Sequence, residues 1–172
     1  YGVKDLQAWD SAYYSEKLKK QKFNFEQEEL RPYFKVDNVI DGIYKVAELL
    51  YGIKFTEIKD VPVYHEEVRV FEVTEKNGDF LSLFYIDLHP RETKNGGAWM
   101  TYFRPQGLSD GKVERPLISI VGNLTPSTEE KTKILTFHEV KNIYLIIGHA
   151  LHGILSNVTY SSLASPDVYW VF

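Results

Sequence analysis

Two histidines near the C-terminal end of this 172-residue sequence are the side chains best suited to chemistry. His149 and His152 stand three residues apart, which would place both imidazoles on one face of a helix. Imidazole binds metal ions and exchanges protons near neutral pH, so the pair could hold a metal or act in acid–base catalysis. A two-histidine surface metal site would be adventitious, and we favour the interpretation of both residues as ordinary core or boundary residues.

Other side chains could join these histidines in one cleft. His138 lies about three helical turns before His149, and the remaining candidates are Tyr102, Tyr160, Ser165 and Asp167. A cleft lined by tyrosine and histidine could bind a small molecule or carry simple acid–base chemistry. A His–Asp–Ser triad is the least favoured possibility, because it requires a three-dimensional arrangement that sequence does not supply.

A long apolar stretch carries these histidines and predicts a helix over residues 135–155. Its apolar residues recur in steps of three or four, at Phe137, Val140, Tyr144, Ile147, Leu151 and Leu155. Thr136 is the predicted N-cap, and Glu139 three residues later completes a capping box. Because the stretch is apolar around so much of the helix, we expect a buried central helix with the other segments packed around it.

The rest of the chain predicts an α+β fold. Helices are expected over residues 3–20 and 38–51, the second with Asp37 as N-cap and Gly52 at its C-terminal end. Alternating patterns predict strands over residues 54–58, 68–73, 80–88, 98–103 and 115–121, and Asn77-Gly78 predicts a hairpin turn. Gly107 and Asp110-Gly111 indicate a loop. We expect a mostly antiparallel or mixed sheet of about five strands in a single domain over residues 1–172.

Composition excludes several classes of function. The net charge is only −4, with basic and acidic residues mixed, so neither a nucleic-acid partner nor a polybasic membrane anchor is expected. No apolar run of about 18 residues and no signal peptide is present, so we expect no membrane partner. The absence of cysteine excludes disulfides and thiolate metal sites. It is consistent with a cytoplasmic protein, or with a recombinant protein from which cysteines were removed.

Several segments, in order along nearly the whole chain, resemble the thimet oligopeptidase and peptidyl-dipeptidase family of zinc metallopeptidases. Residues 148–152 (Gly-His-Ala-Leu-His) match the end of the family's active-site helix, and residues 37–55 and 63–70 match two earlier segments. Residues 85–100 resemble the family's Tyr-x-Asp-Leu-x-x-Arg-x-x-Lys-x-x-Gly-Ala-Trp. The resemblance implies half of a zincin-like catalytic domain.

In the family, the loop equivalent to Gly97, Ala98 and Trp99 holds the substrate backbone as an added strand, so these residues are where a peptide would lie. A glycine-rich turn without a binding role is an equally weighted alternative.

The catalytic part of the family motif is not present. In His-Glu-x-x-His, two histidines bind zinc and the glutamate activates the zinc-bound water. Here the first histidine position is Leu145 and the glutamate position is Ile146, and neither side chain can bind a metal or accept a proton. Of the family's ligands only His149 remains, and the third ligand, a later glutamate, is expected beyond Phe172. We therefore expect no zinc cofactor and no ordinary peptidase activity.

The departures from the family pattern replace polar residues by apolar ones. Besides Leu145 and Ile146, Gly122 stands for a family cysteine and Val171 for a family aspartate. Burying Leu or Ile adds roughly 1.5–3 kcal/mol each. Our hypothesis is an engineered, truncated and inactive subdomain with an overwritten active site, serving as a scaffold or as a binder of a peptide or small molecule. The rival is a natural pseudo-enzyme fragment.

Two further classes of function stay open. Residual or redesigned hydrolase activity could use His149 and His152 in the old cleft. The apolar end, residues 169–172, could fill a groove or form a protein interface, so both a monomer and a homodimer are considered.

Overall fold

The computed structural model describes residues 5–23, 27–124 and 134–165, and it confirms the predicted α+β class. The helices are α1 (Asp10–Phe23), α2 (Val36–Tyr51) and α3 (Phe137–Ile154), with two 3-10 helices, η1 (Gln27–Tyr33) and η2 (Ser161–Leu163). The strands are β1 (Lys54–Ile58), β2 (Arg69–Thr74), β3 (Phe80–Asp87), β4 (Trp99–Arg104), β5 (Gly107–Ser109), β6 (Lys112–Glu114) and β7 (Leu117–Val121).

Five of the strands form one mixed sheet in the order β1-β2-β3-β7-β4. β1–β2, β2–β3 and β4–β7 pair antiparallel, whereas β3 and β7 pair parallel with Phe84 opposite Ile118. The hairpin predicted at Asn77-Gly78 is confirmed, with Gly78 at a φ of 95°. β1 and β4 are the two edges of the sheet, and among the described residues no strand pairs with the outer side of either.

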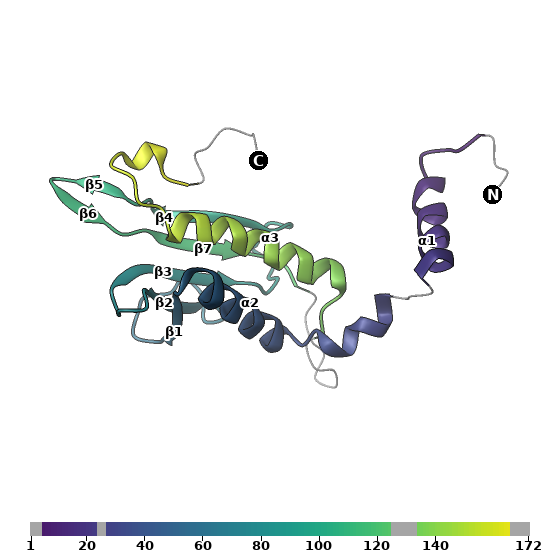
Figure 1. Ribbon diagram of the computed structural model, residues 1–172, viewed down its shortest axis with the longest axis horizontal. Helices are drawn as coiled ribbons and strands as arrows, with labels where there is room; N and C mark the ends of the chain where they lie inside the picture. Colours follow the sequence, from purple (N-terminus) through teal and green to yellow (C-terminus); the bar gives the residue numbers. More distant parts are fainter. Residues whose placement is uncertain (1–4, 24–26, 125–133, 166–172) are drawn as a thin grey trace.

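Both α2 and α3 cover the same face of this sheet, α2 over β1–β3 and α3 over β4 and β7 (Figure 1). The two helices bury apolar side chains at the three- and four-residue spacing of one helical face: Val36, Val39, Ile40, Ile43 and Ala47 from α2, and Val140, Ile143, Ile147, Ala150 and Ile154 from α3. They pack against Phe84, Ile118 and Ile120, which are fully buried on alternate positions of β3 and β7. This is the main core of the protein.

The expectation of a buried central α3 is only partly met. The predicted capping box is confirmed, because the Glu139 N–H donates to Thr136 Oγ1 at 3.2 Å and the Thr136 N–H donates to the Glu139 carboxylate at 2.7 Å. However, α3 lies on one face of the sheet and turns its other side to solvent, with Leu145 62% exposed and Tyr144 44% exposed. Among the described residues, no helix is long and apolar enough to cross a membrane.

Two of the predicted helix starts are wrong. The first helix begins at Asp10, not at residue 3; none of its residues is buried, and it stands apart from the sheet (Figure 1). The second begins at Val36 after Lys35, so Asp37 lies inside the first turn, where its charge suits the helix dipole but does not cap. Gly52 ends this helix as predicted, at a φ of 72°.

The loop predicted around residues 107–111 contains a short hairpin. β5 and β6 pair antiparallel, and the turn residues Asp110 and Gly111 have φ values of 49° and 75°. Positive φ at both central residues is what a tight two-residue hairpin turn requires, and Asp-Gly is a preferred pair for it. The strands have only three residues each, which is too short for an alternating pattern to be recognised.

Candidate functional site

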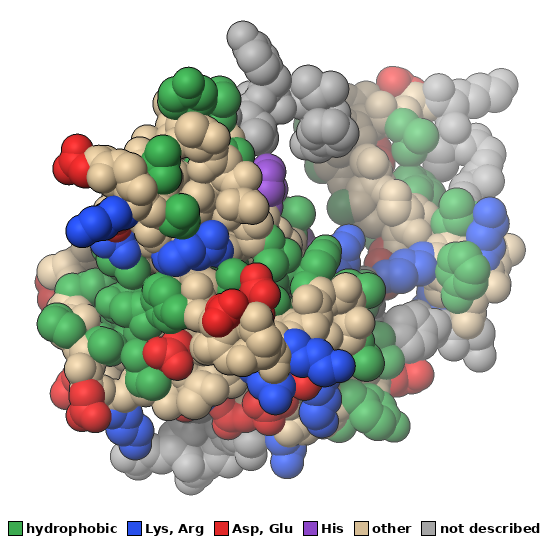
Figure 2. Space-filling model, turned by 60° about the vertical axis from the view of Figure 1, so that its left-hand side comes forward, with side chains coloured by type: hydrophobic (Ala, Val, Ile, Leu, Met, Phe, Trp, Pro, Cys, Tyr) green, Lys and Arg blue, Asp and Glu red, His purple; other side chains and the backbone are tan. Residues whose placement is uncertain are grey.

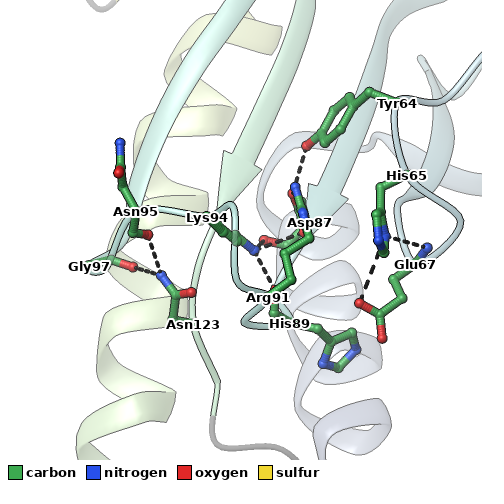
Figure 3. Close-up of polar contacts among 10 residues, drawn as sticks. All are labelled: Tyr64, His65, Glu67, Asp87, His89, Arg91, Lys94, Asn95, Gly97 and Asn123. Atoms are coloured by element: carbon green, nitrogen blue, oxygen red, sulfur yellow. Dashed lines mark hydrogen bonds and ion pairs between the residues drawn. The ribbon is translucent and has the colours of Figure 1, made fainter.

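A buried ion cluster ends strand β3 and organises the loop that follows it. Arg91 donates to Asp87 through both Nη atoms, at 2.9 Å to Oδ1 and 2.8 Å to Oδ2. Lys94 Nζ donates to Asp87 Oδ1 at 2.8 Å, and the Tyr64 hydroxyl donates to Oδ2 at 2.9 Å. Lys94 also donates to the backbone carbonyls of Asp87 and His89 (Figure 3). The loop over residues 88–98 is therefore tied back onto the strand end from which it leaves.

The hydrogen bonds keep this cluster ionised. Burial raises the pKa of Asp87, but the hydrogen bonds from Arg91, Lys94 and Tyr64 outweigh that effect and lower its pKa to about 2. The pKa of the Tyr64 phenol is raised by burial and by its hydrogen bond to Asp87, so it remains a donor. A carboxylate locked in this way is a structural anchor and is unsuited to exchanging protons near neutral pH.

Asn123 fixes the far end of the same loop. Its side-chain amide donates to the Asn95 carbonyl at 3.0 Å and to the Gly97 carbonyl at 2.8 Å (Figure 3). Gly97 has a φ of 97°, a conformation that side chains other than glycine rarely adopt. The loop is therefore braced at both ends, by Asp87 at its start and by Asn123 immediately before β4.

Strand β4 follows this braced loop and forms a free edge of the sheet. Its residues are half-buried or exposed, with Trp99 36% exposed. Phe103 packs edge-on against Tyr85 and Tyr64, at centroid separations of 5.2 and 6.3 Å, which holds the strand to the second face of the sheet. An edge with unpaired backbone groups and a rigid entry can accept an added strand from another chain.

A pocket of about 220 Å³ lies between the start of β4 and helix α3. Gly97 and Ala98 line it from the loop, and Ile146 lines it from the helix. The structure thus brings together two of the three residues expected to hold a peptide backbone, Gly97 and Ala98, and the position at which the resembled motif has its glutamate. Ile146 is 7% exposed, so its contribution to the core agrees with the expectation of apolar burial there.

Leu145 does not agree with that expectation. Its side chain is 62% exposed, so an apolar residue at this position buries little apolar surface. Of the two apolar residues, Leu145 and Ile146, only Ile146 has the stabilising effect expected from burial. His149, one helical turn further on, is exposed on the same open side of α3.

The donor set does not fit a catalytic zinc. Of the two helix positions that would supply histidines, only His149 carries an imidazole, and Leu145 has no donor atom. Within residues 5–23, 27–124 and 134–165, no group of three or more His, Cys, Asp or Glu side chains could hold a metal ion. His152 instead lines a separate groove of about 500 Å³ with Tyr51 and Leu163.

The other candidate side chains do not converge on the histidines. His138 is exposed and contacts Asn142 through Nε2 at 3.2 Å; eleven residues of helix separate it from His149 by roughly 16 Å. Tyr102 packs against the main core, and Tyr160 is exposed at the start of η2.

The His–Asp–Ser triad, the least favoured possibility, gains no support from the residues that the structure describes. Ser165 is buried beside Ser156, whose hydroxyl donates to the His152 carbonyl at 2.9 Å and not to its imidazole. Asp167 and residues 169–172, which include Val171, lie outside the described residues.

Sequence reasoning missed the residues that brace the loop. Asp87, Arg91, Lys94 and Asn123 were not singled out, although the first three form a spaced Asp-x-x-x-Arg-x-x-Lys series directly after a strand. That series was available as a signal, since a carboxylate followed by two cations across a turn can form a local ion cluster. Asn123 lies two residues beyond β7, and the antiparallel pairing of β7 with β4, with Trp99 opposite Val121, brings it to the Gly97 end of the loop.

Charge is mixed on the face of the molecule that Figure 2 draws. Lys and Arg side chains alternate with Asp and Glu, and hydrophobic side chains lie between them (Figure 2). No wide field of one sign covers that face, in keeping with the small net charge of −4.

The sequence of the chain is similar to a known protein family and to several of its members. The family described as Peptidase family M3 matches residues 1–172. Oligopeptidase A of Escherichia coli is 38% identical over 159 residues, which cover 92% of this chain and 23% of that protein. Dipeptidyl carboxypeptidase of Escherichia coli is 38% identical over 162 residues, covering 94% of this chain and 24% of that protein.

A eukaryotic relative matches in the same way. Saccharolysin of Saccharomyces cerevisiae is 30% identical over 173 residues, covering 95% of this chain and 24% of that protein. The chain thus spans about a quarter of the length of the curated relatives it matches. Since the family match extends over residues 1–172, this chain belongs to peptidase family M3.

Proposed function

We propose that this chain is a catalytically inactive portion of the family M3 fold that holds an extended peptide along the free edge of β4. The observation that carries the proposal is the braced entry to that edge. Asp87 and Asn123 fix the loop at both ends with hydrogen bonds of 2.8–3.0 Å, and Gly97 and Ala98 lead from it into β4, whose outer side pairs with no other strand of the described residues. A preorganised edge lowers the ordering cost of adding a strand.

The inactive state follows from the side chains on α3. Leu145 and Ile146 offer neither a metal ligand nor a proton acceptor, so activation of a zinc-bound water is not available to these residues. The bracing of the loop does not depend on these two helix positions. The residues that brace the loop come from β3, from the loop that follows it and from Asn123.

Peptide binding is tested with a fluorescently labelled extended peptide and measurement of its anisotropy. N-methylation of one backbone amide at a time should weaken binding at every second position, because successive N–H groups of an added strand point alternately toward and away from its neighbour. Hydrogen exchange should show new protection over residues 99–104 and none over residues 54–58, the opposite sheet edge. Equal effects at all positions, or protection at β1, would refute edge binding at β4.

Inactivity is tested by peptide hydrolysis with and without added zinc. We expect no turnover in either case. Turnover that disappears in the His149→Ala variant would show that the α3 histidines form a working site and would overturn the proposal.

We also propose an engineered origin for the replaced positions, with Ile146 as its support and the exposed Leu145 as the point against it. If both residues were chosen for stability, Leu145→His and Ile146→Glu should each lower the melting temperature. If only Ile146→Glu lowers it, selection for stability does not explain Leu145, and a natural inactive member of the family becomes the better account.

A further inference from the structure

The pocket beside the start of β4 has an apolar interior. Its lining residues are Leu88, Gly97, Ala98, Gly122, Asn123, Leu124, Glu139, Asn142, Ile143 and Ile146. Its volume of about 220 Å³ is below the range of roughly 300–1,000 Å³ typical of pockets for drug-sized ligands, so it suits a single side chain.

Each polar side chain in the lining already has a partner. Asn123 donates to the Asn95 and Gly97 carbonyls. Glu139 accepts from Thr136 in the capping box at 2.7 and 2.9 Å. Asn142 contacts His138 at 3.2 Å. These hydrogen bonds hold the polar side chains in place at the margin of the pocket.

The remaining lining is hydrocarbon. Leu88, Leu124, Ile143 and Ile146 are all buried aliphatic residues of the main core. Ile146 decides the character of the inner wall, because a carboxylate at this position, as in the motif this helix resembles, would add a second charge to that of Glu139. In this chain an anionic guest would lose its hydration and meet the Glu139 carboxylate, whereas an apolar guest would leave water at no such cost.

We infer that this pocket is a subsite for one apolar side chain of the peptide held on β4. The inference rests on the proposed function, since Gly97 and Ala98 both line the pocket and lead into the edge strand. Side chains of an added strand alternate between the two faces of the sheet, so one residue of the peptide can point under α3 while its neighbours do not. Specificity comes from the apolar wall, which favours Leu, and from the Glu139 carboxylate, which repels Asp.

The test uses peptides that are identical except for one residue, placed in turn at each position as Ala, Leu, Phe, Asp or Lys. We expect one position at which Leu binds roughly tenfold more tightly than Ala, at which Asp binds no better than Ala, and at which Lys binds less tightly than Leu. Ile146→Glu should abolish the preference for Leu. Leu145→Glu is the matched control, because it adds the same charge to the neighbouring residue, which does not line the pocket.

The outcomes separate the two proposals. If N-methylation gives the alternating pattern but no position prefers Leu, edge binding stands and the subsite is refuted. If no peptide binds at all, both are refuted. A preference for Leu that survives Ile146→Glu in a variant with unchanged circular dichroism would place the subsite elsewhere. Should that variant fail to fold, the substitution series on the unaltered protein still decides the matter.

Discussion

Replacing Asp87 with asparagine should destabilise the protein severely. Asp87 is 1% exposed and Lys94 has a 3% exposed side chain, so the pair is desolvated and close, at 2.8 Å. Asparagine keeps the size of the side chain but removes the charge. Lys94 is then left as a buried cation without a counter-charge, and breaking a buried pair in this way costs roughly 3–5 kcal/mol.

The pH dependence gives a second magnitude. The pKa of Asp87 falls from an ordinary value of 3.8 to about 2 on folding. A carboxyl group whose pKa is lower in the folded state contributes stability above its unfolded pKa, and loses it as pH falls through the folded value. At 1.36 kcal/mol for each pKa unit, about 2 kcal/mol should be lost between pH 4 and pH 2. The Asp87→Asn variant has no carboxyl group to protonate at this position, so its free energy of unfolding should not show this loss.

Urea unfolding at several pH values measures both effects. The free energy of unfolding of Asp87→Asn should lie about 3–5 kcal/mol below that of the unaltered protein at pH 6, and the gap should narrow by about 2 kcal/mol by pH 2. Glu57→Gln is the control, because Glu57 also binds an arginine, Arg69, through two hydrogen bonds but is 37% exposed. It should cost less than about 1 kcal/mol. Equal costs for the two variants would refute the reasoning.

Other changes test the packing and capping of α3 by thermal and urea unfolding. Gly148→Ala should raise the free energy of unfolding by about 0.5–1 kcal/mol, because its added Cβ would meet no atom within 4 Å; a loss would contradict this account. Gly153→Ala should lower it by about 1–3 kcal/mol, since its Cβ would lie 2.8 Å from Ile118 and 3.1 Å from Met100. Thr136→Ala should cost about 1 kcal/mol by removing the cap, and no loss of helical circular dichroism or stability would show that Glu139 alone suffices.

The fold was largely predictable because its patterns are local. The capping box at Thr136 and the glycine at Gly52 both mark helix ends with chemistry written within four residues of sequence. β1 was predicted residue for residue from its alternation. The Asn77-Gly78 pair predicted the hairpin that joins β2 and β3.

The predictions that failed have two causes. Either two local signals were equally plausible, or the feature depends on contacts between distant segments. Asp37 suits an N-cap, yet Lys35 holds that position and the helix begins two residues earlier than predicted, at Val36, which is buried in the core. The apolar pattern of α3 did not show that Leu145 faces solvent, since a sequence contains no information on which neighbours are present to cover a face. Asn123 and Gly97 meet because β4 and β7 pair antiparallel, with Trp99 opposite Val121.

The two replaced positions on α3 are adjacent in sequence but have opposite physical consequences. Ile146 points toward the sheet, joins the core and turns the wall of a pocket apolar, so it can affect both stability and recognition. Leu145 points to solvent and leaves an apolar side chain exposed beside His149. Restoring the glutamate without the histidine would therefore cost core stability without creating a metal site, while restoring the histidine alone would change little. The proposed loss of catalysis and the proposed binding of a peptide at β4 are compatible because they depend on different elements, α3 for the first and the loop between β3 and β4 for the second.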